Sequence, residues 1–427
     1  MNSEVHQPLP PHSLRRRQVL LGASALALGA MAGASGRGRE AAAAPNWRVP
    51  VTPPNGVARA QIFDGGCTQA DIARYRGRVD FTWGARYLDW QPSDVLASRY
   101  VQPEILYSHT PPTSWKDYDL AWFRANHPDW VMYKNDRVTP AYGSGTWVPL
   151  DLSNPDVREW HFDLVVQPHI DNGAPVIAMD GMMPWNYTSR AGHHGADGTW
   201  VQQYTGAKFD ADYVADKADY ARWITGKLHA VGVAAAGNIF MQRDADTYEY
   251  QTSLQMAGEL DIVVDEGGFL HRGLSHGMNG LADQSWRNHL GYVQTMLAAG
   301  KAVAVVDETS VIRGLDAPAS EVAYSLASYF LYKSPGAMLY LGYYYGPFDE
   351  RPEMDADIGV AVDQAHEVAG GAWVRHYTDG LSVVNPQSAP RRVNVPLPPG
   401  QYRDLSGTVV SRCVKLGPVS GTVLTRL

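Results

Sequence analysis

Short apolar runs recur along the chain between residues 61 and 342, and polar loops and stretches with helical periodicity separate them. Eight such runs occur, at 61–64, 79–83, 104–108, 176–180, 233–238, 261–265, 302–307 and 337–342. Several are continuously apolar, as expected for a parallel strand covered on both faces. The pattern predicts an α/β fold, a (β/α)8 TIM barrel.

The segments between the runs predict helices. Asn154 and Pro155 combine a capping residue with proline at the first helical position, so a helix is expected from there toward Asn172. Apolar residues recur about every 3.6 positions between 209 and 231, and similar patterns occur at 280–299 and 319–333. An open doubly wound sheet is the competing architecture, but no run is followed by its G-x-G-x-x-G turn.

The pattern changes near residue 372 to short alternating strands punctuated by proline and glycine. Strands are expected at 373–385 with a break at Asp379-Gly380, and at 392–397, 402–405 and 422–427. These strands predict a small C-terminal antiparallel β-domain. The predicted organisation is a targeting segment at 1–44, a catalytic barrel at 45–371 and the β-domain at 372–427.

The N-terminal residues have the three parts of a twin-arginine signal peptide. The basic part is Arg15-Arg16-Arg17, an Ala/Leu/Gly-rich stretch occupies 19–35, and small residues at 41–44 offer an Ala-x-Ala cleavage site. The middle stretch is shorter and less apolar than the roughly 20 residues of a membrane span. We therefore expect an exported, extracytoplasmic protein with no stable membrane anchor after cleavage.

Composition and charge narrow the classes of partner. The chain is 45% hydrophobic and 19% charged, which is typical of a globular protein. Its formal charge is −8, and removal of residues 1–43 takes away five Arg and two Glu and leaves −11. Since no basic patch remains, a nucleic-acid partner is not expected. The sequence does not indicate the oligomeric state.

The two cysteines, Cys67 and Cys413, have neither a metal-ligand spacing nor a C-x-x-C spacing. They are either two free thiols or one disulfide bond between the C-terminal region and the loop after the first strand.

Carboxylates follow four of the apolar runs. Catalytic groups of TIM barrels lie at the C-terminal ends of the strands, so acids at these positions are candidates. A single acid there could equally cap a helix, but several like charges around one rim indicate function. Some of these acids are adjacent in the sequence, and adjacent residues of a strand point to opposite faces. Only one acid of each adjacent pair is therefore expected to reach the barrel mouth, and the sequence does not show which one. The acids are Asp64, Asp180, Asp265, Glu266, Asp307 and Glu308.

Aromatic and amide side chains are frequent in the same loops. Aromatic faces stack on sugar rings and amides bind hydroxyl groups, so the mixture favours a carbohydrate substrate, although any single aromatic side chain can equally serve packing. The candidate substrate-binding residues are Asp64, Trp83, His109, Trp147, Trp185, Asn238, His271 and Tyr343.

Other catalytic chemistries have weak sequence signals. His193-His194 lies in a Gly-rich segment, but a metal-dependent barrel hydrolase needs histidines at strand ends, where the first run has Phe63-Asp64-Gly65. No G-x-S-x-G nucleophile motif occurs. We expect no catalytic metal and no cofactor.

Several motifs resemble those of hypothetical glycosyl hydrolases of the bacterial TIM-barrel type. They are N-H-P-D-W at 126–130, L-D-L-S-N-P-D-V-R at 150–158 and M-D-G at 179–181. The segment V-D-E-G-G-F at 264–269 is similar to the sixth strand of polygalactosaminidase-type barrels, and the tail at 378–427 is similar to the β-domain that ends many such hydrolases. The resemblance implies a barrel glycosidase with Asp180 and Glu266 as its acids.

The leading hypothesis is an exported glycoside hydrolase that cleaves an oligo- or polysaccharide with two carboxylates. Asp180 is expected as the ionised nucleophile or base and Glu266 as the general acid, with Glu308 or Asp265 as the substitute. The alternatives are a non-catalytic carbohydrate-binding barrel and a metal-dependent barrel hydrolase. The sugar, the linkage and the stereochemical outcome stay open.

Overall fold

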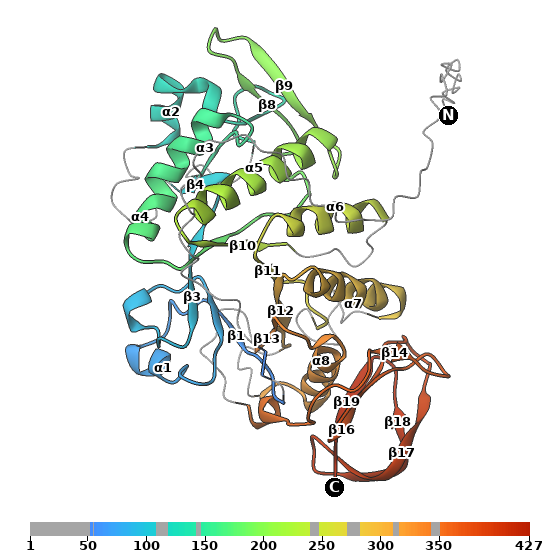
Figure 1. Cartoon of the computed structure of the whole chain (residues 1–427). Coiled ribbons are helices and arrows are strands. Elements are labelled where there is room, and N and C mark those ends of the chain that lie inside the picture. Colours follow the sequence, from blue (N-terminus) through green and yellow to red (C-terminus); the bar gives the residue numbers. More distant parts are fainter. Residues whose placement is uncertain are drawn as a thin grey trace, which may run out of the picture. The chain divides into compact units, whose positions relative to one another are not determined.

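Eight parallel strands form the central sheet of the computed structural model, which describes residues 52–53, 55–107, 118–141, 147–239, 247–270, 282–310, 316–342 and 351–427 (Figure 1). In their order around the sheet the strands are β1 (Ala60–Ile62), β2 (Phe81–Trp83), β3 (Leu96–Val101), β7 (Val176–Met179), β10 (Ala234–Asn238), β11 (Ile262–Asp265), β12 (Ala302–Glu308) and β13 (Ala337–Gly342). A parallel bridge between Arg59 and Leu339 joins the last strand to the first. The sheet is therefore a closed barrel, and the predicted fold class is confirmed.

The third barrel strand was wrongly assigned from the sequence. The predicted run at 104–108 contains β4 (Ile105–Tyr107), which pairs antiparallel with β6 (Trp147–Pro149) outside the barrel. The barrel strand at this place is β3, in which Ser98 and Arg99 interrupt the apolar pattern. Arg99 is accommodated there because its Nη1 donates to the carbonyl oxygen of Ala85 at 2.8 Å.

The register between neighbouring strands determines the stagger of the barrel. Five consecutive paired residues are Tyr100, Ala178, Ala236, Ile262 and Ala302. The register from β3 through β2 extends this row of paired residues to position 64 of β1, and the register from β12 through β13 extends it to position 56 of β1. The row therefore returns to β1 eight positions earlier than it started. A stagger of eight over eight strands is the usual TIM-barrel geometry. Each step to the next strand thus shifts the level along the barrel axis by one residue.

Alternate strand residues fill the barrel interior, and most of them are small. They belong to one buried cluster that includes Ala178, Ala236, Val264 and Val306. The residues between them belong to a second cluster, which packs against the surrounding helices. Interior positions are therefore the even-numbered ones on β7, β10, β11 and β12.

Helices cover the barrel where helical periodicity predicted them. They are α5 (Ala211–Ala230), α7 (Asp283–Ala298) and α8 (Ala319–Tyr332), with the shorter α1 (Gln69–Ala73) and α6 (Thr247–Gly258). The helix expected after Asn154 is α3 (Pro155–His161), which continues through a π-helical turn at Phe162–Val166 into α4 (Gln167–Asp171). The side chain of Asn154 accepts from the amide of Asp156 at 2.9 Å, as a capping residue should.

Two insertions interrupt the alternation of strands and helices. The first, between β3 and β7, contains β4, β6, α2 (Leu120–Asn126) and β5 (Tyr133–Lys134). The second, between β7 and α5, is the hairpin of β8 (Arg190–His194) and β9 (Trp200–Thr205), which extends beside α5 (Figure 1). β5, β8 and β9 form one small sheet. His193 belongs to this hairpin, where its Nδ1 lies 3.2 Å from Asp151 Oδ2.

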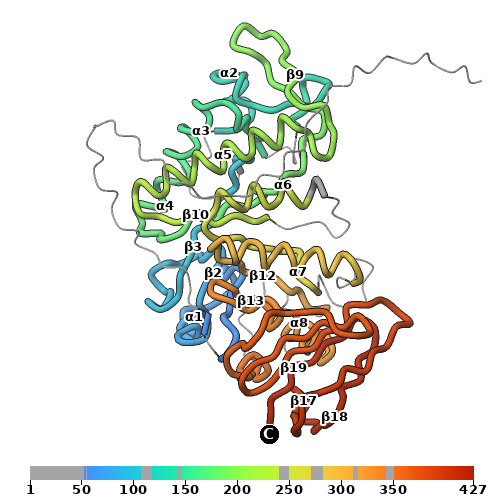
Figure 2. The backbone as a smooth tube through the Cα atoms, turned by 45° about the vertical axis from the view of Figure 1, so that its right-hand side comes forward, coloured from blue at the N-terminus to red at the C-terminus, as the bar shows by residue number. Residues whose placement is uncertain are grey.

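The C-terminal strands form a six-stranded antiparallel sheet of order β14-β15-β16-β19-β17-β18. Their bounds are His366–Glu367, Trp373–Tyr377 and Gly380–Asn385 for β14 to β16, and Val393–Asp404, Val409–Leu416 and Ser420–Arg426 for β17 to β19. β16 and β19 pack on α8 (Figure 2). The approach is close at Gly421, where a Cβ atom would lie 2.7 Å from the Cβ of Ala327.

Arg375 of β15 joins this sheet to the end of α8. Its Nη1 donates to the carbonyl oxygens of Phe330, Leu331 and Lys333 at 3.3, 3.2 and 2.6 Å. The last carbonyls of a helix have no partner within the helix, and a cation there also interacts favourably with the helix dipole. The Arg375 side chain is buried, so this contact replaces water at the helix end.

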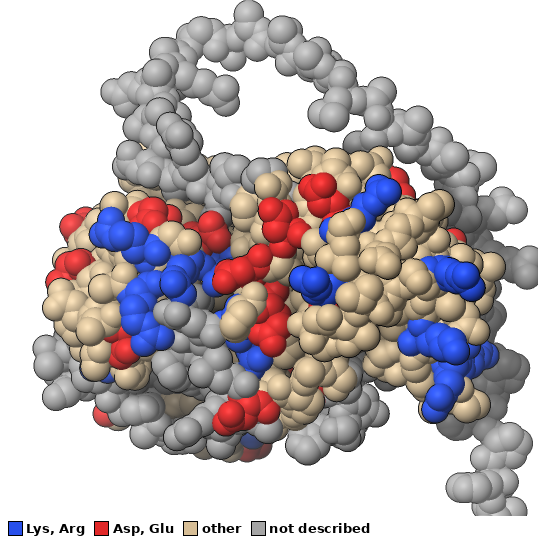
Figure 3. All heavy atoms as spheres, turned by 90° about the horizontal axis from the view of Figure 1, so that it is seen from below, with Lys and Arg blue, Asp and Glu red and all other residues tan. Residues whose placement is uncertain are grey.

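The surface carries charges of both signs. On the face drawn in Figure 3, acidic and basic side chains lie next to one another. Cys67 and Cys413 are free thiols. Within the part of the chain that the structure describes, no helix has both the length and the hydropathy needed to cross a membrane.

We expect Arg375→Ala to lower the free energy of unfolding by about 2 to 3 kcal/mol, because three buried carbonyls lose a charged donor. Chemical denaturation measures this change. Arg403→Ala is the matched control, since Arg403 is an exposed arginine of the same sheet. Equal effects of the two substitutions would show that the contact with α8 adds no stability.

Candidate functional site

Asp180 directly follows β7 and accepts three hydrogen bonds. Tyr100 OH donates to its Oδ2 at 2.5 Å, while Asn238 Nδ2 and the amide of Gly181 donate to its Oδ1 at 2.9 and 2.7 Å. Tyr100 and Asn238 belong to β3 and β10, the strands on either side of β7. Hydrogen bonds to a carboxylate favour its charged form. The two neighbouring strands therefore fix both the position and the orientation of this carboxylate.

The stagger of the barrel relates Asp180 to Glu266. Ala178 pairs with Ala236 and Ala236 pairs with Ile262, so two strand steps place Val264 at the level of Ala178. By the same count, Glu266 is at the level of Asp180. Both residues have even numbers, like the residues of β7 and β11 that point into the barrel, and each directly follows the end of its strand. One layer of the barrel mouth thus contains both acids, on alternate strands.

Interior parity also separates the members of each adjacent acidic pair. Glu266 and Glu308 have the parity of the interior residues Val264 and Val306. Asp265 and Asp307 have the opposite parity and are fully buried. Strand alternation thus turns Asp307 away from the mouth and Glu308 toward it on β12, and on β11 it turns Asp265 away from the mouth, toward α7.

The outward acids contact the helices and loops around the barrel. Asp265 Oδ2 lies 2.7 Å from Nε2 of His289, a buried residue of α7. Asp307 Oδ1 accepts the amides of Phe269 and Leu270 at 2.5 and 3.1 Å, and burial raises the pKa of Asp307. These contacts order the segment that follows Glu266. Asp265, one of the candidate acids, is placed away from the mouth.

The turn after β11 requires glycine. Gly268 has a φ of +46°, and a Cβ atom at this position would collide with Val306 O and Asp307 Oδ1. A glycine here lets the chain turn sharply directly after Glu266.

Asp64 follows β1 and is buried, and both of its oxygens have partners within the protein. Oδ1 accepts the amide of Arg86 and Oδ2 accepts Gln91 Nε2, each at 2.6 Å. Burial raises the pKa of Asp64, and these hydrogen bonds oppose the rise. The structure therefore places Asp64 as a support for the loop after β2.

The predicted substrate-binding aromatics occupy different environments. Trp83 is fully buried inside the barrel, where its Nε1 has no hydrogen-bond partner among the described residues. Trp147 begins β6, outside the barrel. Trp185 follows β7 and is partly buried, with Lys208 Nζ 5.4 Å from its ring. His109, His271 and Tyr343 lie outside the described residues.

A buried lysine lies behind the Asp180 turn. Lys217 Nζ lies 2.5 Å from Glu104 Oε1 and donates to the carbonyl oxygen of Gly181 at 3.0 Å. Tyr213 OH donates to the same Glu104 oxygen at 2.7 Å. Burial lowers the pKa of Lys217, while Glu104 beside it acts in the opposite direction. The group connects α5 and the chain after β3 to the residue next to Asp180.

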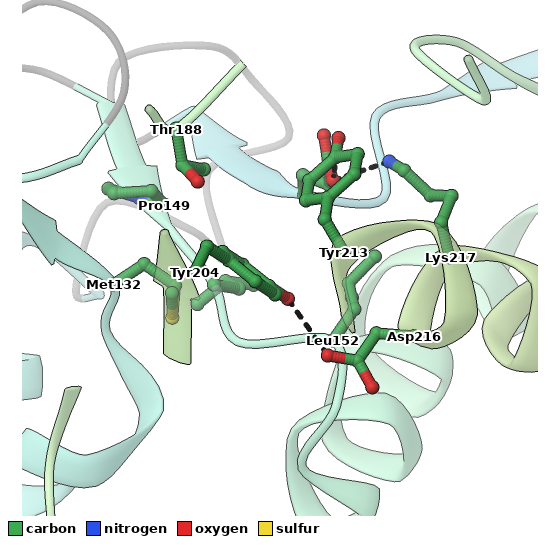
Figure 4. A pocket seen from close by; sticks show the side chains of 10 residues that line it. Met132, Pro149, Leu152, Thr188, Tyr204, Tyr213, Asp216 and Lys217 are labelled. Carbon is green, nitrogen blue, oxygen red and sulfur yellow. Dashed lines mark hydrogen bonds and ion pairs between the residues drawn. The ribbon is translucent and has the colours of Figure 1, made fainter. Parts of the chain in front are cut away.

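A small cavity of about 20 Å³ adjoins this buried group (Figure 4). Its polar lining includes Tyr204 and Asp216, which are hydrogen-bonded to each other at 3.1 Å, and its apolar lining includes Met132 and Leu152. Lys217 and Tyr213 contribute groups that are already paired. The cavity therefore lies beside the support for Asp180 and does not contain the acids of the mouth.

Tyr100 and Lys217 were not identified from the sequence. Tyr100 was missed because β3 was wrongly assigned, although Leu96, Ser98 and Tyr100 alternate as one face of a strand should. Lys217 falls on the apolar stripe of α5, four residues after the buried Tyr213. A lysine among the apolar positions of a predicted helix was thus the sequence feature that could have indicated a buried charge.

The described residues of the mouth bring together carboxylate, hydroxyl and amide groups, a combination that can transfer protons and bind sugar hydroxyls. A cluster of groups that could ligate a metal does occur among the described residues, at Asp363, His366 and His376, but it contains none of these acids. The fold and the mouth thus define a (β/α)8 barrel with an acidic site at its C-terminal end.

Residues 107–381 match the family described as Hypothetical glycosyl hydrolase family 15. This match covers more than half of the chain, and the protein belongs to that family. It is therefore a glycoside hydrolase by family, as the sequence motifs implied.

Comparison with solved structures finds α-amylases. A noncanonic maltogenic α-amylase from Thermotoga neapolitana is 12% identical, with a TM-score of 0.47 over 88% of this chain and 99% of that chain. An α-amylase from Geobacillus thermoleovorans complexed with acarbose is 11% identical, with a TM-score of 0.47 over 83% of this chain and 90% of that chain. No curated protein sequence matches the chain.

We expect Lys217→Met to lower the free energy of unfolding by about 3 kcal/mol, because it leaves Glu104 without its buried partner. Lys227→Met is the matched control on the same helix. Lys227 Nζ lies 2.5 Å from Glu159 Oε2, the same distance, but these side chains are 35% and 51% exposed, against 1% and 16% for Lys217 and Glu104. Chemical denaturation should show that Lys227→Met lowers the free energy of unfolding by less than about 1 kcal/mol. Equal losses would contradict a role for burial.

Proposed function

We propose that the protein is an exported glycoside hydrolase that cleaves an oligo- or polysaccharide with Asp180 and Glu266. The observation that supports this pair is their common layer at the barrel mouth, which follows from the strand registers. Family membership supports the reaction class.

The contacts of Asp180 suit an ionised carboxylate. Three donors, from Tyr100, Asn238 and the Gly181 amide, use both of its oxygens. All three stabilise negative charge and none needs Asp180 to donate a proton. We assign Asp180 as the group that attacks the anomeric carbon or deprotonates the attacking water.

Glu266 has the environment of a general acid. It is partly buried, and Glu308 has the same interior parity one strand further on, with a side chain that is 6% exposed. The two acids belong to neighbouring positions in the strand order, since Glu266 directly follows β11 and Glu308 ends β12. Glu266 transfers its proton to the glycosidic oxygen while the bond from that oxygen to the anomeric carbon breaks. Glu308 is the substitute for this role.

The spacing of the strands is compatible with this chemistry. Two strand steps of about 4.8 Å each separate the Cα atoms of Asp180 and Glu266 by roughly 10 Å. A Cα separation of this size is compatible with carboxyl groups that lie closer together than the Cα atoms. Glycosidases use carboxyl separations between about 5 and 9.5 Å.

Asp180→Asn and Glu266→Gln should each lower kcat by about 10²- to 10⁴-fold with little change in unfolding free energy, because each removes a reacting group. A panel of oligo- and polysaccharides, with reducing-end release as the readout, first identifies a substrate. Near-normal turnover in both variants would contradict the pair. Binding of glycans without any product release would favour the non-catalytic alternative.

Asp265→Asn is the matched control, because residue 265 is next to Glu266 but points outward, toward His289. It should change stability while the turnover per folded molecule stays near normal. A loss of turnover equal to that of Glu266→Gln would contradict the assignment of the inward position to Glu266.

The proposed export is compatible with a polymeric substrate, since large glycans are cut outside the cytoplasm. We propose that the twin-arginine signal at 1–44, which lies outside the described residues, directs this export. Replacement of both Arg16 and Arg17 by lysine should leave the uncleaved precursor in the cytoplasm. The unchanged chain should instead yield a periplasmic or secreted form that begins near residue 45. N-terminal mass spectrometry of the fractions measures this, and export of the double variant at the normal level would contradict the pathway.

A further inference from the structure

Three metal-ligating side chains meet at the edge of the C-terminal sheet, away from the acids of the mouth. Asp363 precedes β14, His366 begins β14 and His376 belongs to β15. Each offers one ligand atom, and these atoms lie within 4.8 Å of one another.

The strand pairing brings these residues together. His366 pairs with Val374 in the antiparallel contact between β14 and β15. The preceding segment also follows β15, because the amide of Val362 donates to the carbonyl oxygen of His376 at 3.0 Å. Backbone hydrogen bonds thus position all three side chains on neighbouring segments.

The distances are close to those of a zinc site. Asp363 Oδ2 lies 2.6 Å from His376 Nδ1 and 3.8 Å from His366 Nδ1. Ligands about 2.1 Å from a tetrahedral zinc ion are separated by about 3.4 Å, between the two observed values. Adjustments of below about 1 Å in the side chains would therefore bring the three atoms into one coordination sphere.

The orientation of the carboxylate is already fixed. Asp363 Oδ1 accepts the amide of His376 at 2.8 Å, which leaves Oδ2 directed toward the two imidazole rings. The rings are stacked, with centroids 5.8 Å apart. Hydrogen bonds of this kind orient metal ligands and raise affinity. Two contacts compete with a metal: His366 Nδ1 lies 3.0 Å from the carbonyl oxygen of Gln364, and His376 Nδ1 is hydrogen-bonded to Asp363 Oδ2 at 2.6 Å.

We propose that Asp363, His366 and His376 bind a divalent transition metal, with zinc as the best fit to a set of two imidazoles and one carboxylate. The side chains of these residues are 32%, 47% and 33% exposed, so water can supply the fourth ligand. The site contains none of the acids of the barrel mouth, so we assign it no part in cleavage of the glycosidic bond. It fastens the segment before β14 to β15.

The ion would stabilise a part of the sheet that has few contacts of its own. β14 is an edge strand of two residues. Its Glu367 lies 3.2 Å from Arg287 of α7, so β14 also connects the sheet edge to the barrel helices. Metal binding is therefore expected to stabilise the attachment of this edge.

Titration of the untagged, chelator-treated protein with Zn²⁺, followed by calorimetry, tests the proposal. One site is expected in the unchanged protein, and thermal unfolding should shift to higher temperature when zinc binds. His366→Ala should weaken binding by about tenfold or more and remove the shift. Cobalt as a spectroscopic probe should show tetrahedral absorption in the unchanged protein only.

His229→Ala is the matched control. His229 Nε2 lies 2.8 Å from Asp261 Oδ2, and its side chain is 49% exposed, close to the 47% of His366, but among the described residues this pair has no third ligand. This variant should bind zinc as the unchanged protein does. An absence of zinc binding, or equal binding by the His366→Ala protein, would overturn the proposal. Because calorimetry does not depend on turnover, failure here is distinct from failure of the glycosidase assignment.

Discussion

The stagger of the eight barrel strands is the constraint on which the site depends. It raises the level by one residue at each step, so Asp180 and Glu266, which directly follow β7 and β11 and are far apart in the chain, have the same level when the count is continued past the strands. The same geometry puts Tyr100 and Asn238 on the strands that flank Asp180, one level lower, where their side chains reach its two oxygens. A slip of one residue in β7 would exchange Asp180 for an apolar neighbour and direct the carboxylate toward the helices.

Adjacent acids have different tasks because a strand has two faces. On β12 the inward acid is Glu308, and Glu266 directly follows β11, whereas the outward acids Asp265 and Asp307 contact the helices and loops around the barrel. Asp265 lies against His289, and Asp307 accepts the backbone amides of the loop that follows Glu266. Glu266 and Glu308 are thus sequence neighbours of the outward acids, whose contacts help to fix the positions of the strand ends.

The periphery repeats this use of buried charge at segment ends. Lys217 binds the carbonyl oxygen next to Asp180 and is paired with Glu104, while Arg375 binds the last carbonyls of α8. In each case a long cationic side chain donates to backbone carbonyl oxygens at the end of a segment. The first contact supports the mouth, and the second joins the C-terminal sheet to the barrel. The proposed metal site would add a third connection at the free edge of that sheet.

The sequence by itself determined the barrel class, seven of its eight strands, the main helices and the positions of the strand-end acids. These are local properties, because burial on both faces produces apolar runs and helices have a period of 3.6. It could not identify β3, whose Ser98 and Arg99 are acceptable only because partners distant in the chain satisfy them. Nor could it choose between Asp265 and Glu266, or relate Glu266 to Asp180. These relations depend on the strand register and on which strand residues point inward, and both are set by pairing between segments that are distant in the chain.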